Sequence, residues 1–177
     1  MYRFRQFFGA LTARIDDRDE KVLARLLTPP QVALFRRMAR NDQRHSLNVC
    51  ATLRQAGYED PALLTAALLH DAGKAAGHIR LWQRALSVLL RRWAPKLLHW
   101  LERGTWHAST SFFKAPWWRR GFVVNRLHPK LGARWAIEAG CSPTTLDLIR
   151  RHEGPIQQTK TDQDWRLAAL QRADGVN

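Results

Sequence analysis

Apolar residues recur along this chain at helical spacing, three or four positions apart, and no window shows the sustained alternation and hairpin turns of paired β-strands. The pattern therefore predicts an all-α fold. The first expected helix carries an apolar stripe, interpreted as a core-facing surface rather than a membrane anchor, made of Phe4, Phe7, Phe8, Leu11 and Ile15. A second helix is expected to end before Pro29-Pro30, and a third to run from about Gln31 to Ala39.

Proline marks the start of several of the later helices. Asp60-Pro61, His128-Pro129 and Ser142-Pro143 each predict a helix whose first turn holds the proline, where its missing N–H has no cost. Polar residues that can cap two further helices are Asn41 or Asp42, before a helix ending at Gly57, and Thr161 or Asp162, before the last helix.

Length and composition indicate one folded domain. The 177 residues are 45% hydrophobic and 25% charged, which is ordinary for a soluble globular protein. The two cysteines, Cys50 and Cys141, indicate neither a disulfide framework nor a cysteine-rich zinc site, so a reducing cytoplasm is expected. We expect no signal peptide, and no run approaches the ~18 apolar residues of a transmembrane helix.

A strong positive charge narrows the class of partner. The chain has 29 Lys and Arg against 15 Asp and Glu, a formal net charge of +14. Such a field favours polyanions, which include nucleotides, nucleic acid and anionic lipid surfaces, and does not choose among them.

Six potential metal ligands follow one another along the chain: His45, His70, Asp71, His128, His152 and Asp174. Imidazoles and carboxylates bind divalent transition metals together, and a metal with an open position can ionise bound water near neutral pH. Each candidate falls at or near an expected helix end, where side chains from several helices can converge on one pocket. Asp71, at the end of an apolar helix, is costly to bury without a neutralising partner.

The stretches around these ligands resemble the HD superfamily of metal-dependent phosphohydrolases. The matching segments are QRHSLNV at His45, LLHDAGK at His70 and Asp71, HPKLGA at His128, IRRHEG at His152 and RADGVN at Asp174. The resemblance spans about residues 42 to 174 and excludes roughly 76 to 122. It divides the single domain, 1–177, into N-terminal helices at 1–40, a metal-site core at 41–75 and 123–177, and a basic aromatic insert at 76–122.

The resemblance implies an all-helical core that binds one or two divalent metals, with Mn, Fe, Ni, Zn and Mg all open. One metal is implied at His45, His70, Asp71 and Asp174. A second is implied at His128 and His152, with Asp71 bridging; the alternative is a single metal, with those two histidines contacting substrate phosphate.

Three basic residues near the motifs are candidates for phosphate contact. Lys74 lies three residues beyond Asp71, and these two residues are the expected catalytic pair. Lys74 could neutralise a phosphate oxygen; a solvated lysine is the alternative. Arg44 and Arg151 neighbour ligands and could grip phosphate, or could be ordinary surface charge. Ala72, Gly73 and Lys74 stand where alarmone hydrolases carry an acidic pair, which disfavours that substrate.

The insert is basic and aromatic. From Arg80 to Arg134 there are twelve Lys or Arg and one acid, Glu102, and six of the eight tryptophans lie between Trp82 and Trp118. A helix expected from Arg80 to Trp93 has arginines on one side and Trp and Leu on the other. It could cover the core, bind a lipid surface, or contact nucleotide or nucleic acid. A loop from Thr105 to Asn125 could form a lid over the metal pocket.

Two functions are therefore expected. The leading hypothesis is a cytoplasmic hydrolase, with a peripheral location at the membrane left open, that cleaves a phosphate ester or anhydride of a nucleotide-like substrate through metal-activated water. The alternative is a non-catalytic module of the same fold that binds nucleotide, RNA or an anionic membrane.

Overall fold

The computed structural model describes residues 15–77, 79, 81–103, 106–107, 112–113, 115–155 and 162–177. The fold is all-α, as the sequence predicts. Its elements in chain order are α2 (Asp17–Leu26), α3 (Pro29–Arg36), α4 (Arg40–Gln55), α5 (Pro61–Leu69), the 3₁₀ helix η2 (Ala72–Ala76), α6 (Leu81–Trp93), α7 (Pro95–Leu101), β1 (Trp106–His107), β2 (Phe112–Phe113), α8 (Arg120–Glu138), α9 (Pro143–Arg151) and α10 (Asp162–Val176). The two short strands pair antiparallel. Most of the expected N-terminal stripe lies outside the described residues.

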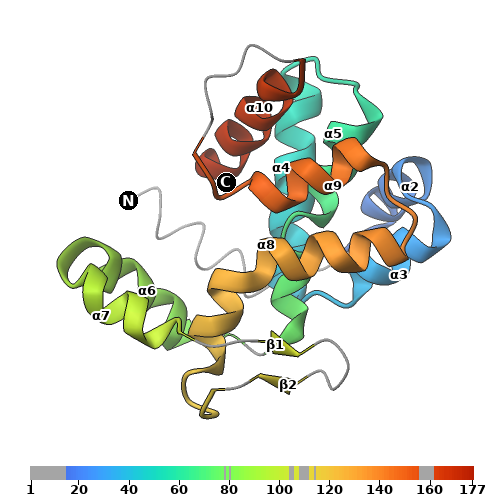
Figure 1. The fold of residues 1–177 in the computed structure, drawn as a ribbon. Coiled ribbons are helices and arrows are strands. Elements are labelled where there is room, and N and C mark those ends of the chain that lie inside the picture. The colour runs from blue at the N-terminus through green and yellow to red at the C-terminus, as the bar shows by residue number, and fades with distance from the viewer. Residues whose placement is uncertain are drawn as a thin grey trace.

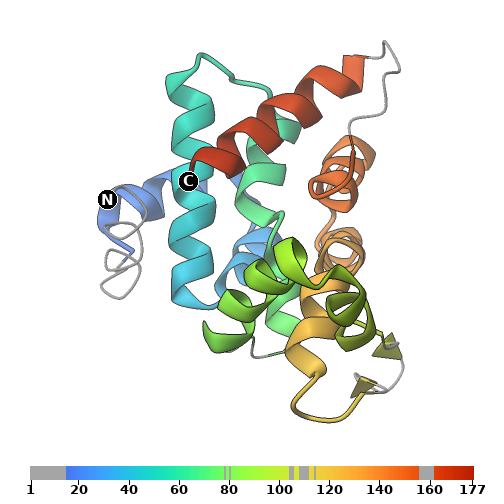
Figure 2. The same cartoon turned by 90° about the vertical axis from the view of Figure 1, so that its left-hand side faces the viewer.

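Helix α5 occupies the centre of the fold. Its sequence, PALLTAALL, is apolar on all sides, and every residue from Leu63 to Leu69 is buried. Figure 2 shows α5 between α4 on one side and the α8–α9 pair on the other, with α10 crossing one end. A helix this apolar is stable only when other elements cover it completely, so α5 fixes the positions of its neighbours. The candidate ligands His70 and Asp71 directly follow it.

A second, smaller cluster holds the insert. Leu98 and Leu101 of α7 are buried with Phe122 of α8, and Leu86 and Leu90 of α6 pack against them. Figure 1 shows α6 and α7 side by side as a helical hairpin at one end of the molecule. Within the described residues, no helix is both long enough and apolar enough to cross a membrane.

The prediction that His128-Pro129 opens a helix is wrong. Helix α8 begins at Arg120 and contains Pro129 in its interior. Proline leaves the carbonyl of Asn125 without its usual N–H donor four residues on. The ring of His128 replaces that donor, because its Nδ1 lies 2.7 Å from Asn125 O. The helix therefore continues through the proline, and the lost hydrogen bond is used to orient a candidate ligand.

Two further expectations need correction at helix boundaries. The cap of α4 is Ala39, and Asp42 is buried inside its first turn. The expected loop from Thr105 to Asn125 ends earlier, because residues 120–125 are already helical in α8. Phe122, Val123 and Val124 are buried there, and this burial favours helix over an exposed loop.

Asp60 is expected to stabilise the fold in two ways. Its carboxylate caps α5 by accepting from Leu63 N at 2.9 Å, and Arg166 of α10 donates to it at 2.7 Å. The hydrogen bond from Arg166 lowers the pKa of Asp60, against a smaller opposing effect of burial. We expect Asp60→Ala to reduce the free energy of unfolding by about 2 kcal/mol at neutral pH, measured by urea denaturation.

The same stabilisation should depend on pH with a definite sign. The pKa of Asp60 in the folded protein lies below its unfolded value of about 3.9. The stabilisation by ionised Asp60 is therefore fully present above the unfolded pKa and is lost as pH falls through the folded pKa. The stability difference between wild type and Asp60→Ala should therefore shrink below about pH 4. Asp17→Ala, at an exposed position of α2, is the control. A difference that stays constant with pH contradicts the proposed charge interaction.

Candidate metal centre

The six predicted ligands come from five different elements and meet at one place. Their positions are His45 in α4, His70 and Asp71 in the turn between α5 and η2, His128 in α8, His152 at the C-terminal end of α9, and Asp174 near the end of α10. His70, Asp71, His128 and His152 are buried, and His45 and Asp174 are partly exposed. The site therefore has a closed side and an open side.

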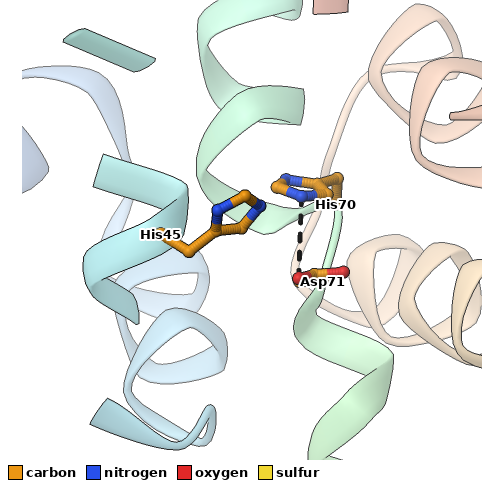
Figure 3. Close-up of side chains that lie close together, drawn as sticks. All are labelled: His45, His70 and Asp71. Atoms are coloured by element: carbon orange, nitrogen blue, oxygen red, sulfur yellow. Dashed lines mark ion pairs between the residues drawn. The ribbon is translucent and has the colours of Figure 1, made fainter. Parts of the chain in front are cut away.

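Donor atoms of His45, His70 and Asp71 form the first group, in which all lie within 4.8 Å of one another. Figure 3 shows the rings of His45 and His70 approaching from separate helices above the carboxylate of Asp71. His70 Nε2 lies 3.7 Å from Asp71 Oδ2 and 3.5 Å from Asp174 Oδ1. His45 Nε2 lies 2.7 Å from Asp174 Oδ1. Asp174 thus lies against the two histidines of the first group, although 103 positions or more separate it from all three members in the sequence.

Asp71, His128 and His152 form the second group within the same distance limit. His128 Nε2 lies 3.3 Å from Asp71 Oδ1 and 3.2 Å from His152 Nε2. Asp71 belongs to both groups and offers Oδ2 to the first and Oδ1 to the second.

Three of the histidines are oriented by the same kind of hydrogen bond to a backbone carbonyl. Nδ1 lies 2.9 Å from Ala67 O in His70, 2.7 Å from Asn125 O in His128 and 2.8 Å from Ile149 O in His152. Each acceptor is the carbonyl three residues earlier, left without its helical donor by a helix end or by proline. A carbonyl oxygen can only accept, so Nδ1 carries the proton in each ring. Each ring consequently directs Nε2 into the site, as metal-ligating histidines do.

The donor set fits a cation on two observations. His70 Nε2 is buried and has no hydrogen-bond partner in the described part of the chain. The Nε2 atoms of His128 and His152 face each other at 3.2 Å, and two lone pairs at that distance repel unless a proton or metal lies between or beside them. Nitrogen and carboxylate donors suit divalent transition metals. The buried His/Asp groups could therefore hold a metal ion.

Charge in the site is arranged to keep the carboxylates ionised. Burial alone would raise the pKa of Asp71, but Lys74, His70 and His128 hold it well below its usual range. Burial likewise opposes ionisation of Asp174, while the hydrogen bond from His45 and the nearby ring of His70 lower its pKa. Both carboxylates are therefore available as anionic ligands.

The histidine pKa values differ between the two groups. Burial, together with neighbouring His70 and His128, lowers the pKa of His152 to about 3, so its ring is neutral at physiological pH. Burial also opposes charge on His70, but Asp71 and Asp174 outweigh it and raise its pKa. The pKa of buried Cys50, by contrast, is raised to about 11, which keeps that thiol protonated and unsuited to binding metal.

A cavity of about 530 Å³ adjoins the metal centre. Its lining includes Lys74, Asn125 and Glu153 beside the ligands and Ser87, Val88, Arg91 and Arg92 of α6. Lys74 Nζ lies 2.6 Å from Asp71 Oδ2, and Glu153 Oε1 lies 3.9 Å from His128 Nε2. The cavity thus runs from residues beside the candidate ligands to the insert and has three cationic side chains against one carboxylate.

The two arginines predicted to grip phosphate have protein partners. Arg44 forms a two-point ion pair with Asp19 of α2, at 2.5 and 3.2 Å. Arg151 donates to Asp147, four residues earlier in α9, at 2.9 Å. Neither arginine lines the cavity beside the metal centre. Their contact with phosphate stays a prediction.

Some contributors to the site have no signal in the sequence. Arg91, Arg92 and Ser87 line the cavity only because the insert folds back onto the core. Gln171 of α10 donates to the carbonyls of His152 and Gly154, at 3.0 and 2.7 Å, and so secures the end of α9 that carries a ligand. Glu153, by contrast, directly follows the candidate ligand His152 in the sequence, and this position could have indicated that it lies beside the site.

Comparison with known proteins gives no match to any family model, curated protein or solved structure. The His/Asp cluster is nevertheless compatible, in outline, with the metal site that the HD-type motifs imply.

Proposed function

We propose that this protein is a metal-dependent phosphohydrolase of the HD type that cleaves a phosphate ester or anhydride of a nucleotide-like substrate. The observation that carries the proposal is the convergence of six His and Asp side chains from five elements, with three histidines aimed by backbone carbonyls. These hydrogen bonds satisfy carbonyls that lack a helical donor, but they do not require the Nε2 atoms of His128 and His152 to face each other in a buried space, an arrangement that is costly without a cation.

The proposed ligands divide between two positions. His45, His70, Asp71 and Asp174 would hold one divalent metal, and Asp71, His128 and His152 would hold a second. The alternative is one metal in the first position, with His128 and His152 left to contact phosphate. Metals of this class supply Lewis-acid polarisation of a phosphate and an acidified water. Mn, Fe, Ni, Zn and Mg all remain open, because mixed imidazole and carboxylate sites accept each of them.

The chain's own groups would then position an anionic substrate. Lys74, partly exposed beside Asp71, is placed to neutralise charge on a phosphate in the cavity. Arg91 and Arg92 line the far side of the same cavity and suit a second anionic group of the substrate. The volume of about 530 Å³ falls in the range of small-molecule sites. A phosphorylated substrate with charge at two positions, such as a nucleotide, matches this lining.

The test is phosphate release by purified protein supplied with Mn²⁺ and a panel of nucleoside phosphates and dinucleoside polyphosphates. We expect release from at least one substrate that stops on addition of a chelator. Lys74→Met should lower the rate about 100-fold, as removal of a charge-stabilising donor does elsewhere, without removing bound metal. Lys21→Met, at an exposed position of α2, is the matched control.

The alternative function is a non-catalytic module that binds nucleotide, RNA or membrane through the same cavity and insert. Binding of a panel member, measured by calorimetry, without phosphate release from any of them would favour this module and contradict the hydrolase.

A further inference from the structure

We propose that the α6–α7 hairpin docks on the surface of an anionic lipid bilayer. The apolar side chains that carry the inference do not line the cavity beside the metal centre, although the neighbouring Arg91 and Arg92 do. The inference does not depend on the proposed hydrolase activity. It starts from a set of exposed apolar side chains that we call the hairpin face: Trp82, Leu89 and Trp93 of α6, and Leu97 and Trp100 of α7.

The hairpin face is ordered by helical periodicity. On α6, Trp82, Leu89 and Trp93 are separated by seven and four residues, which places them on one stripe of the helix. On α7, Leu97 and Trp100 are three residues apart and also share a side. These five side chains are 47, 57, 77, 47 and 46% exposed, in chain order. A soluble protein rarely leaves so many large apolar groups exposed on two adjacent helices without an interaction partner.

Both helices are already anchored through other residues. Leu98 and Leu101 bury one side of α7 against Phe122, and Leu86 and Leu90 of α6 pack on the same cluster. Covering the core accordingly accounts for those leucines and for the edge-on contact of Trp82 with Phe122, 5.9 Å between ring centres, but not for exposed Leu89, Trp93 and Leu97. Figure 1 shows that α6 and α7 stand together at one end of the molecule.

The hairpin also carries exposed positive charge. Exposed basic side chains on these helices and directly beside them are Arg91, Arg92, Lys96, Arg103 and Arg120. The single acid between residues 80 and 134 is Glu102, which is partly buried. Arg119 stacks on Trp100 with its guanidinium 4.6 Å from the ring centre, so charge and aromatic surface are combined in one ordered cluster. Trp and Leu beside Arg and Lys is the composition of helices that lie in the interface of anionic membranes.

Two other occupants fit the same surface less well. A second copy of this chain would bring Arg and Lys of both copies together across a two-fold axis, and their repulsion opposes a dimer. A single-stranded nucleic acid would use the tryptophans for stacking and the arginines for phosphates, but it has no use for exposed Leu89 and Leu97. Acyl chains accommodate both the aliphatic and the aromatic groups. An anionic bilayer therefore explains the whole composition of the face.

Vesicle binding tests the proposal without reference to activity. Wild-type protein is expected to float at low salt with phosphatidylcholine vesicles that contain phosphatidylglycerol, and much less with pure phosphatidylcholine. Its tryptophan emission should shift to the blue on binding and be quenched by brominated lipid, because the hairpin face enters the acyl boundary. Added salt should weaken the binding.

Matched variants separate the hairpin from the rest of the surface. Leu89→Gln/Trp93→Gln should lower the vesicle partition coefficient by at least about tenfold. Ile137→Gln/Trp165→Gln, which removes one exposed aliphatic and one exposed aromatic group outside the hairpin, should leave it unchanged. Arg92→Gln/Lys96→Gln should weaken binding by about tenfold, and Lys21→Gln/Arg25→Gln on α2 should not. Circular dichroism verifies that each variant is folded.

Three results would overturn the proposal. The first is failure of wild-type protein to float with anionic vesicles at low salt. The second is equal binding by the hairpin variants and their controls. The third is tight binding to a single-stranded oligonucleotide that the hairpin variants lose, without vesicle binding, which would identify the face as a nucleic-acid platform.

Discussion

Asp71→Asn is expected to remove bound metal and to lower phosphate release by more than about 100-fold. This loss exceeds the loss of activity that usually follows removal of a residue that only supports a metal ligand. The substitution keeps the shape of the side chain and removes its charge. Asp71 belongs to both ligand groups, with Oδ1 3.3 Å from His128 Nε2 and Oδ2 3.7 Å from His70 Nε2. No other described carboxylate is shared in this way. Elemental analysis of the purified variant measures the metal directly.

Thermal unfolding gives a second measurement that does not need a known substrate. A metal present at about 100 times its dissociation constant stabilises the folded state by about 2.7 kcal/mol, which corresponds to roughly 5 to 11 °C for a chain of this size. Wild type and the control Asp17→Asn should show this rise with Mn²⁺, and Asp71→Asn should not. An equal rise in all three proteins, with normal metal content in Asp71→Asn, would refute the proposed centre.

Helix starts that depend on neighbouring residues were predictable. Asp60 and Ser142 each accept from the backbone N–H three residues on and each precede proline, so sequence alone places α5 and α9 correctly. His128-Pro129 has the same form but lies within α8. The difference is the ring of His128, which supplies the missing donor to Asn125 O. The sequence pattern does not distinguish a histidine that precedes a helix from one inside a helix whose ring replaces the hydrogen-bond donor that proline lacks.

The meeting of the candidate ligands in space was predictable, but the contacts around them were not. The order of the motifs indicated that His45 and Asp174 would meet, and their side chains are 2.7 Å apart across 129 positions of sequence. The partner of Arg44 is Asp19, 25 positions away, and no local pattern connects them. The cavity likewise depends on where the insert packs, because Arg91 and Arg92 reach it from α6. Tertiary packing decides such contacts, and periodicity does not report it.

Gly73→Ala is expected to destabilise the fold by about 3 kcal/mol or more and to weaken metal binding, although the residue carries no functional group. Gly73 belongs to η2, which packs closely on α8. An added Cβ would overlap His128 O and would lie 2.7 Å from Gly132 N, and both are backbone atoms of a helix that cannot move aside locally. Relief requires η2 to separate from α8, which carries Asp71 and Lys74 away from His128.

Two control variants compare the loss of stability at glycines with more space around the added Cβ. Gly132→Ala meets Gly73 N at 3.1 Å and Ile149 Cγ2 at 3.4 Å, so a smaller loss of stability is expected. Gly175→Ala has no atom within 4 Å of the added group and should be neutral, or stabilising by up to about 1 kcal/mol through helix propensity. Urea denaturation of the three variants without metal measures the order, and elemental analysis measures the accompanying loss of metal. If Gly73→Ala were as stable as Gly175→Ala, η2 would not approach α8 this closely, and Asp71 would not lie within reach of His128.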